Sequence, residues 1–267
     1  MPDVTQPDYA LLDRLGAASM AFHPRPDNSR PPEGATDYLI EVDPGVSVGA
    51  RFYHQPGPEY PTILYFHGNG EVVGDHDQFV SLYYDNGINL FVAEFRGYGK
   101  SGGVSSMEHL SADARPVAAF FQRTLDELGY DGRRYVMGRS MGASPALEVA
   151  ANAPEGFHGV VIESGAAGVR GMLERFGVAE HGTALELIEA HEAKIRSIGL
   201  PTMQIHGEVD QLVSMQTAVE LYNLLEGTSR EIVVIPYGDH NTILWVGQVP
   251  YMEALGRFID TNAPARE

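Results

Sequence analysis

The chain has 267 residues, 43% of them hydrophobic, and is therefore long enough for one large domain with a sizeable core. It contains no cysteine, which excludes a disulfide framework, a thiol nucleophile and a cysteine metal site, and suits a reducing, cytoplasmic location. A formal net charge of −18 disfavours nucleic acid as a partner. The acidic residues are spread along the chain rather than gathered in a run, which is typical of a solvated surface.

Residues 1–36 predict an N-terminal helix followed by a Pro-rich connector that wraps the main domain. The helical segment lacks a basic leader, and Asp13 and Arg14 interrupt its apolar positions. We therefore expect neither a signal peptide nor a membrane span.

Residues 37–267 predict one α/β domain. Alternating apolar and polar residues on both sides of Asp43-Pro44-Gly45 predict a hairpin of two strands. Short apolar runs typical of strands buried on both faces follow, separated by helical stretches such as 107–128 and 214–226. The pattern predicts a mostly parallel, doubly wound sheet of about eight strands with flanking helices. The apolar runs are TILYF (62–66), INLFVAEF (88–95), RYVMG (134–138), GVVIES (159–164), PTMQIHG (201–207) and EIVVIP (231–236).

Residues 165–198 interrupt this alternation, and we interpret them as a small helical lid. Thr183 and Glu186 have the spacing of a capping box at the start of a helix. Four apolar lid residues recur at helical spacing, either to pack the lid onto the sheet or to line an acyl pocket. These residues are Val169, Met172, Leu173 and Phe176.

The segment Gly138-Arg139-Ser140-Met141-Gly142 fits the G-x-S-x-G pattern, in which a strand turns sharply into a helix and exposes the serine. A side chain at position 138 or 142 would collide with the adjoining strand or helix, so both positions need glycine. Because similar Gly/Ser patterns also occur in ordinary turns, the assignment depends on the rest of the chain.

Polar residues follow four of the predicted strands, and in a parallel sheet such strand ends meet at one edge. A serine nucleophile needs a base, and the base needs an acid that orients it. Ser140, Asp210 and His240 can fill these roles on separate strand ends. The four strand-end segments are His67–Gly70, the turn at Ser140, His206–Asp210 and Gly238–His240.

From about residue 37 to the C-terminus, the sequence resembles serine hydrolases of the α/β-hydrolase superfamily, nearest to short-lidded members with an HGN oxyanion strand. The chain order Ser, Asp, His is the order that this fold uses. The motifs that carry the resemblance are ILYFHGNG, EFRGYGKSGG, MGRSMGAS, KIRSIGLPTMQIHGEVDQLV and YGDHN.

The resemblance implies acyl transfer, in which Ser140 attacks a carbonyl carbon. It also implies an oxyanion hole made by the backbone N–H groups of Met141 and Asn69, with Gly70 as the alternative to Asn69. We expect no cofactor and no metal. The residues expected to bind substrate are Gly70, Arg139, Val169, Leu173, Phe176 and Val213.

Several residues have a competing interpretation. Glu163 lies at another strand end and is the alternative acid, although its position favours Asp210. His67 and His206 precede glycines on buried strands. This position favours a supporting, hydrogen-bonded role beside the site over a role as the catalytic base. Asp239 is expected to point away from the site.

Other chemistries are less well supported by the sequence. His206, Glu208 and Asp210 alternate as metal ligands can, but such alternation is common at strand ends. Residues 97–102 satisfy G-x-G-x-x-G after a strand, yet helical periodicity begins only near Met107, which disfavours a nicotinamide enzyme.

The sequence therefore predicts a serine hydrolase that cleaves a small carboxylic ester through an acyl-enzyme on Ser140. A thioesterase, an amidase and an acyltransferase would use the same three residues and stay open, as does a non-catalytic binding protein on the same fold. We expect a compact, mainly apolar acyl ester as substrate, because the negative charge of the chain disfavours a polyanion. The natural substrate, the acyl-chain length and the oligomeric state are left open.

Overall fold

The structure is a computed structural model that describes residues 6–165 and 168–262. Its centre is an eight-stranded sheet in the order β1-β2-β4-β3-β5-β6-β7-β8. β1 pairs with β2 and β2 with β4 in antiparallel fashion, and the remaining neighbours are parallel. The mostly parallel sheet of the prediction is thus confirmed. The strands are β1 (Ala35–Asp43), β2 (Val46–Tyr53), β3 (Thr62–Phe66), β4 (Asn89–Ala93), β5 (Arg134–Arg139), β6 (Val160–Glu163), β7 (Thr202–Gly207) and β8 (Arg230–Ile235).

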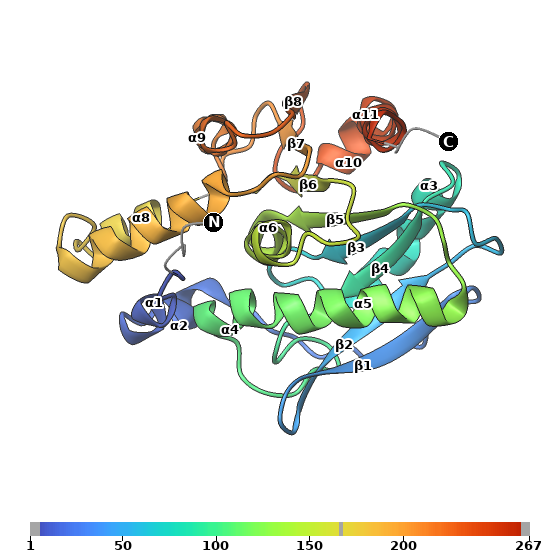
Figure 1. Cartoon of the computed structure of the whole chain (residues 1–267), viewed down its shortest axis with the longest axis horizontal. Coiled ribbons are helices and arrows are strands. Elements are labelled where there is room, and N and C mark those ends of the chain that lie inside the picture. Colours follow the sequence, from blue (N-terminus) through green and yellow to red (C-terminus); the bar gives the residue numbers. More distant parts are fainter. Residues whose placement is uncertain (1–5, 166–167, 263–267) are drawn as a thin grey trace.

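Helices cover both faces of the sheet, as the doubly wound topology requires (Figure 1). One apolar cluster joins one face of the sheet to α5, α6 and α9, and a second joins the opposite face to α3 and α11. The α-helices are α1 (Ala10–Arg14), α2 (Ala17–Ala21), α3 (Val80–Tyr84), α4 (Met107–Ala112), α5 (Ala114–Leu128), α6 (Ala143–Asn152), α7 (Arg170–Arg175), α8 (Gly182–Arg196), α9 (Met215–Leu224), α10 (Ile243–Val246) and α11 (Gln248–Thr261). Two 3-10 helices are η1 (Val73–Gln78) and η2 (Ser140–Gly142).

The predicted helix over 107–128 is divided into α4 and α5. Pro116 gives the physical reason, because it has no N–H to donate to the carbonyl of Ala112 and its ring crowds that carbonyl. α4 ends at Ala112. Asp113, between the two helices, accepts two hydrogen bonds of 2.8 Å from Arg96.

The N-terminal helices and the lid lie together beside the main domain (Figure 1). Buried residues of α1, α7 and α8 form a third apolar cluster that includes Leu12, Leu173 and Leu187. The carboxylate of Asp13 accepts the backbone N–H of Met107 at 2.8 Å, so α1 also helps to cap α4. The N-terminal segment is therefore packed against the domain.

The lid begins its long helix differently from the sequence prediction. α8 begins at Gly182 with His181 as its N-cap, so the predicted capping box is wrong: Thr183 already lies in the first turn. Residues 1–5 of the predicted N-terminal segment and residues 166–167 of the predicted lid lie outside the described residues. Within the described ranges, none of the helices is long and apolar enough to cross a bilayer.

Candidate active site

Ser140 lies on a tight turn between β5 and α6. Its φ of 52° is in the left-handed region that side-chain-bearing residues rarely adopt. A Cβ added at Gly138 would lie 2.1 Å from the carbonyl oxygen of Gly142, and one at Gly142 would lie 2.1 Å from that of Phe66 on β3. The collisions predicted for both positions are therefore confirmed, and the glycines allow the turn to pack this closely.

Ser140, His240 and Asp210 form a continuous chain of hydrogen bonds. The Nε2 atom of His240 lies 2.9 Å from the Oγ of Ser140, and its Nδ1 lies 2.8 Å from the Oδ2 of Asp210. The other oxygen of Asp210 accepts the backbone N–H groups of Leu212 and Val213, each at 2.9 Å. Because the Asp210 carboxylate only accepts, Nδ1 of His240 carries the proton and Nε2 is left to accept from the serine.

The competing residues have other partners. Glu163 accepts hydrogen bonds from Arg139 at 3.1 Å and from the hydroxyl of Tyr251 at 2.6 Å, whereas the imidazole of His240 is held by Asp210. The Nε2 atom of His206 lies 2.8 Å from the carbonyl oxygen of Val213. His206 thus supports the loop that carries Asp210.

The remaining alternatives concern Asp239 and a metal. The exposed side chain of Asp239 accepts the N–H groups of Asn241 and Thr242, each at 2.8 Å, which braces the turn after β8. No group of three or more His, Asp or Glu side chains within residues 6–165 and 168–262 is arranged to hold a metal ion.

A cavity of about 270 Å³ opens at Ser140. Asn69, Met141 and Val169, three residues that the sequence placed near the substrate, are among its walls. The other described lining residues are Tyr9, Leu12, Ala21, Met107, Leu110, Ser144, Leu147, Gly168, Met172 and His191. Most of these side chains are apolar, so the cavity suits an apolar acyl group.

The N-terminal helices supply one wall of this cavity through Tyr9, Leu12 and Ala21, which sequence reasoning missed. The hydroxyl of Tyr9 lies 2.7 Å from the Nδ1 of His191 and accepts a 2.6 Å hydrogen bond from Lys194. Lys194 in turn pairs with Glu148 at 3.0 Å, and both of these side chains are buried. The only sequence signal was the apolar spacing of the first helix, which does not reveal what the helix covers.

Five of the six predicted substrate-binding residues are not among the described residues that line this cavity. Leu173 is fully buried in the third apolar cluster, and Phe176 packs against that cluster. Both side chains therefore face the residues of α1 and α8 that make up the cluster. The carbonyl of Gly70 accepts from Arg25 at 2.6 Å, and the backbone of Val213 serves Asp210 and His206. Arg139 lines a second cavity of about 260 Å³.

The side chain of Asn69 ties the loop after β3 to the N-terminal segment. Its Oδ1 accepts from the backbone N–H of His23 at 3.0 Å and from the hydroxyl of Tyr98 at 2.6 Å, and its Nδ2 donates to the carbonyl of Ala21 at 2.6 Å. The side chain is thus engaged by the N-terminal segment and by Tyr98. An oxyanion role for Asn69 would be carried by its backbone N–H, as the sequence predicts, together with that of Met141 at the start of a helical turn.

His67 makes the stability of the protein depend on pH. Burial lowers the pKa of His67 to about 4, and its Nε2 has no hydrogen-bond partner within the described part of the chain. Between pH about 6.5 and 4, the unfolded chain binds a proton that the folded chain does not, so the free energy of unfolding decreases as the pH falls. The full effect of this one residue is about 3 kcal/mol.

We therefore expect urea unfolding to show a larger loss of stability between pH 7 and pH 4.5 in the wild type than in His67→Gln. Burial also lowers the pKa of His76, which acts in the same direction and should persist in the variant. The exposed His181→Gln is the matched control and should keep the wild-type difference. An identical acid response in wild type and His67→Gln would contradict this prediction.

Comparison with known proteins finds one family model and several proteins that are similar to this chain. Residues 58–181 match the family model described as Serine aminopeptidase, S33. The esterase Pf2001 of Pyrococcus furiosus has a structure similar to this chain, with a TM-score of 0.68, 19% sequence identity, and coverage of 90% of this chain and 99% of that chain. The structural similarity shows that the chain has the α/β-hydrolase fold.

Other similarities extend over most of the chain. Est1E from Butyrivibrio proteoclasticus with bound ferulic acid has a TM-score of 0.65 and 17% identity over 84% of this chain and 98% of that one. The uncharacterized protein YfhR of Escherichia coli is 28% identical over 182 residues, which are 67% of this chain and 62% of YfhR. The α/β-hydrolase domain-containing protein aho-3 of Caenorhabditis elegans is 28% identical over 206 residues, 76% of this chain and 59% of aho-3. The match thus spans about three fifths of these two curated relatives.

Proposed function

We propose that this chain is a serine hydrolase that cleaves small carboxylic esters through an acyl-enzyme on Ser140. The observation that carries the proposal is the hydrogen-bonded chain from Ser140 through His240 to Asp210. The residues come from the ends of three different strands, which is how the fold assembles a nucleophile, a base and an acid. The large apolar cavity at Ser140 provides room for an acyl group.

The proposed reaction proceeds in two halves. Ser140 Oγ attacks the ester carbonyl carbon while Nε2 of His240 takes its proton, and the negative charge on the carbonyl oxygen is stabilised by the backbone N–H groups of Met141 and Asn69. Collapse of this intermediate breaks the bond to the alcohol, which receives the proton from His240. Water then attacks the acyl-enzyme while His240 takes its proton; the bond from the acyl carbon to Ser140 Oγ breaks, Oγ receives that proton from His240, and the carboxylic acid leaves.

The choice of an ester is supported by the structural similarity to Pf2001 of Pyrococcus furiosus, which is named as an esterase. A thioesterase, an amidase and an acyltransferase share the same acyl-enzyme and differ in leaving group or acceptor. Matched butyryl esters, thioesters and amides should be turned over with the ester preferred. A preference for the thioester or the amide would reassign the substrate class while keeping Ser140.

Labelling with a fluorophosphonate separates catalysis from mere binding. We expect stoichiometric modification of Ser140, located by peptide mass spectrometry, and loss of labelling in Ser140→Ala. An unlabelled wild-type protein would favour the non-catalytic binding protein on the same fold.

The wall formed by α2 gives a prediction about acyl-chain length. Ala21 lines the cavity at Ser140, so Ala21→Leu should shorten the space for the acyl chain. We expect kcat/KM for a hexanoyl ester to fall by about tenfold relative to an acetyl ester, since one methylene that a pocket cannot accommodate is worth about 1–3 kcal/mol. The exposed Met20→Leu on the same helix should keep the wild-type ratio. An unchanged ratio in Ala21→Leu would show that the acyl chain lies elsewhere.

A further inference from the structure

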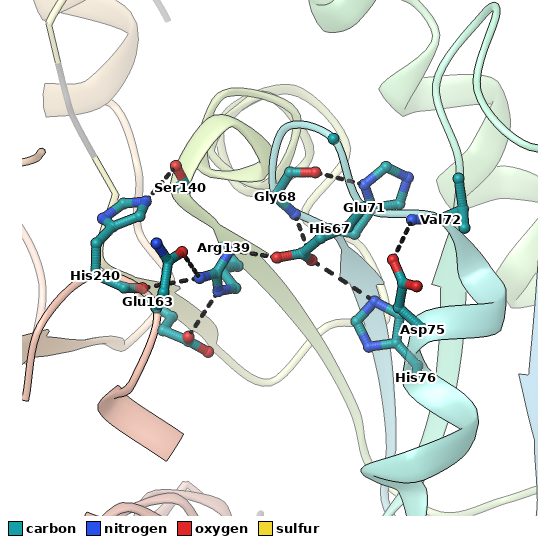
Figure 2. Close-up of polar contacts among 12 residues, drawn as sticks. His67, Gly68, Glu71, Val72, Asp75, His76, Arg139, Ser140, Glu163 and His240 are labelled. Carbon is teal, nitrogen blue, oxygen red and sulfur yellow. Dashed lines mark hydrogen bonds and ion pairs between the residues drawn. The ribbon is translucent and has the colours of Figure 1, made fainter. Parts of the chain in front are cut away.

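The side chain of Arg139 connects the loops on both sides of Ser140 (Figure 2). Arg139 immediately precedes the serine, its side chain is only 13% exposed, and its guanidinium contacts the carboxylates of Glu71 and Glu163. Its Nε donates to Glu163 at the end of β6, at 3.1 Å, and Nη1 donates to Glu71 in the loop after β3. Its Nη2 donates to the backbone carbonyl of His240 at 2.8 Å. One guanidinium thus contacts the end of β6, the loop after β3 and the loop that carries His240.

The contact with Glu71 reaches the loop that carries the predicted oxyanion donor. The second oxygen of Glu71 accepts the backbone N–H of Gly68 at 2.9 Å, and the N–H of Glu71 donates back to the carbonyl of Gly68 at 3.2 Å. A Cβ at Gly68 would lie 2.4 Å from the Nη1 of Arg139, so the loop backbone rests directly against the ion pair. Asn69 follows Gly68 directly. The position of its backbone N–H therefore depends on the ion pair between Arg139 and Glu71 that holds Gly68.

The contact with His240 acts on the base. Asp210 fixes the imidazole ring through Nδ1, whereas Arg139 holds the backbone carbonyl of the same residue. Arg139 also donates to the side chain of Asn241 at 3.2 Å. The ring and the backbone of His240 therefore have separate supports.

We propose that Arg139 is a positioning residue, which through Glu71 sets the oxyanion loop and through the carbonyl of His240 sets the loop of the base, and which does not contact the substrate. The inference rests on the proposed function and replaces the substrate-binding role expected from the sequence. A planar guanidinium can make these divergent contacts at once, whereas the single ammonium group of a lysine cannot.

The test compares steady-state kinetics of an ester in Arg139→Met, Arg139→Lys and Glu71→Gln. We expect kcat to fall by about 10- to 100-fold in Arg139→Met, because displacement of a catalytic group by about 1 Å can cost 10²-fold. KM should stay within about threefold of the wild-type value, since no substrate contact is removed. Arg139→Lys should not restore kcat to the wild-type value.

Arg134→Met is the matched control. Arg134 is an arginine at the opposite end of β5, 15% exposed, and pairs with Asp126. Its replacement should lower the melting temperature without lowering kcat, which separates positioning from a general loss of stability. Should Arg139→Met not fold, Glu71→Gln keeps the test, because its amide oxygen can still accept from Gly68 while the ion pair with Arg139 is lost.

A double variant gives a further readout. Arg139→Met and Glu71→Gln remove the same link, so their combined loss of kcat should be smaller than the product of the two single losses. A raised KM with unchanged kcat in Arg139→Met would overturn the proposal in favour of substrate contact, as would an unchanged kcat in folded protein. Failure here is distinguishable from failure of the proposed function, which would appear as a wild type without fluorophosphonate labelling or ester turnover and would overturn both.

Discussion

Replacement of Ser140 by alanine is expected to lower ester turnover by about 10³- to 10⁶-fold in a protein that remains folded. The loss follows from the removal of the Oγ that lies 2.9 Å from Nε2 of His240. Residual activity above the uncatalysed rate should persist, because the oxyanion site and the cavity are left in place. The measurement is kcat/KM for a neutral butyryl ester, with circular dichroism to check the fold.

A matched control and a contradicting outcome define this test. Ser144→Ala removes another serine hydroxyl that lines the same cavity and should change turnover by less than about threefold, since Ser144 has no part in the hydrogen-bonded chain to His240. Retention of a tenth of wild-type turnover in Ser140→Ala would show that Ser140 is not the nucleophile.

Replacement of Asp210 by asparagine should cost about 10⁴-fold in kcat, an effect that arises from the wrong imidazole tautomer. Two backbone N–H groups, from Leu212 and Val213, hold one oxygen of residue 210 as an acceptor. An asparagine would keep its carbonyl oxygen there and present its amide NH₂ to Nδ1 of His240. That nitrogen would then have to accept, Nε2 would carry the proton, and His240 could not take a proton from Ser140.

Glu163→Gln is the matched comparison, because Glu163 was the alternative acid and is also buried at a strand end. Its oxygens accept from Arg139 and Tyr251, so an amide there should disturb that cluster without changing the tautomer of His240. We expect a loss of less than about tenfold, well below that of Asp210→Asn. Equal losses, or a larger loss in Glu163→Gln, would move the acid to Glu163.

Local patterns in the sequence were sufficient to predict the sheet. The runs over 62–66 and 201–207 correspond to β3 and β7 within one residue at either end, because continuous apolar runs of this length bury both faces of a parallel strand. The turn at Ser140 was predictable for a similar reason, since only glycine tolerates the backbone contacts at positions 138 and 142. The chain order of Ser140, Asp210 and His240 then indicated which strand ends would meet.

The surroundings of the site were decided by the tertiary structure alone. Arg139 contacts Glu71, Glu163 and His240, which lie 68, 24 and 101 residues away along the chain, and its place beside Ser140 in the sequence suggested a substrate contact instead. Tyr9 reaches His191 across 182 residues, which makes the N-terminal helix a wall of the cavity. Apolar spacing shows that a helix has a buried face, as for Leu173, but not what that face meets. Which residue a side chain contacts depends on how elements that are distant in the sequence pack together. Such long-range contacts leave no periodic pattern in the sequence, so they could not be predicted from it.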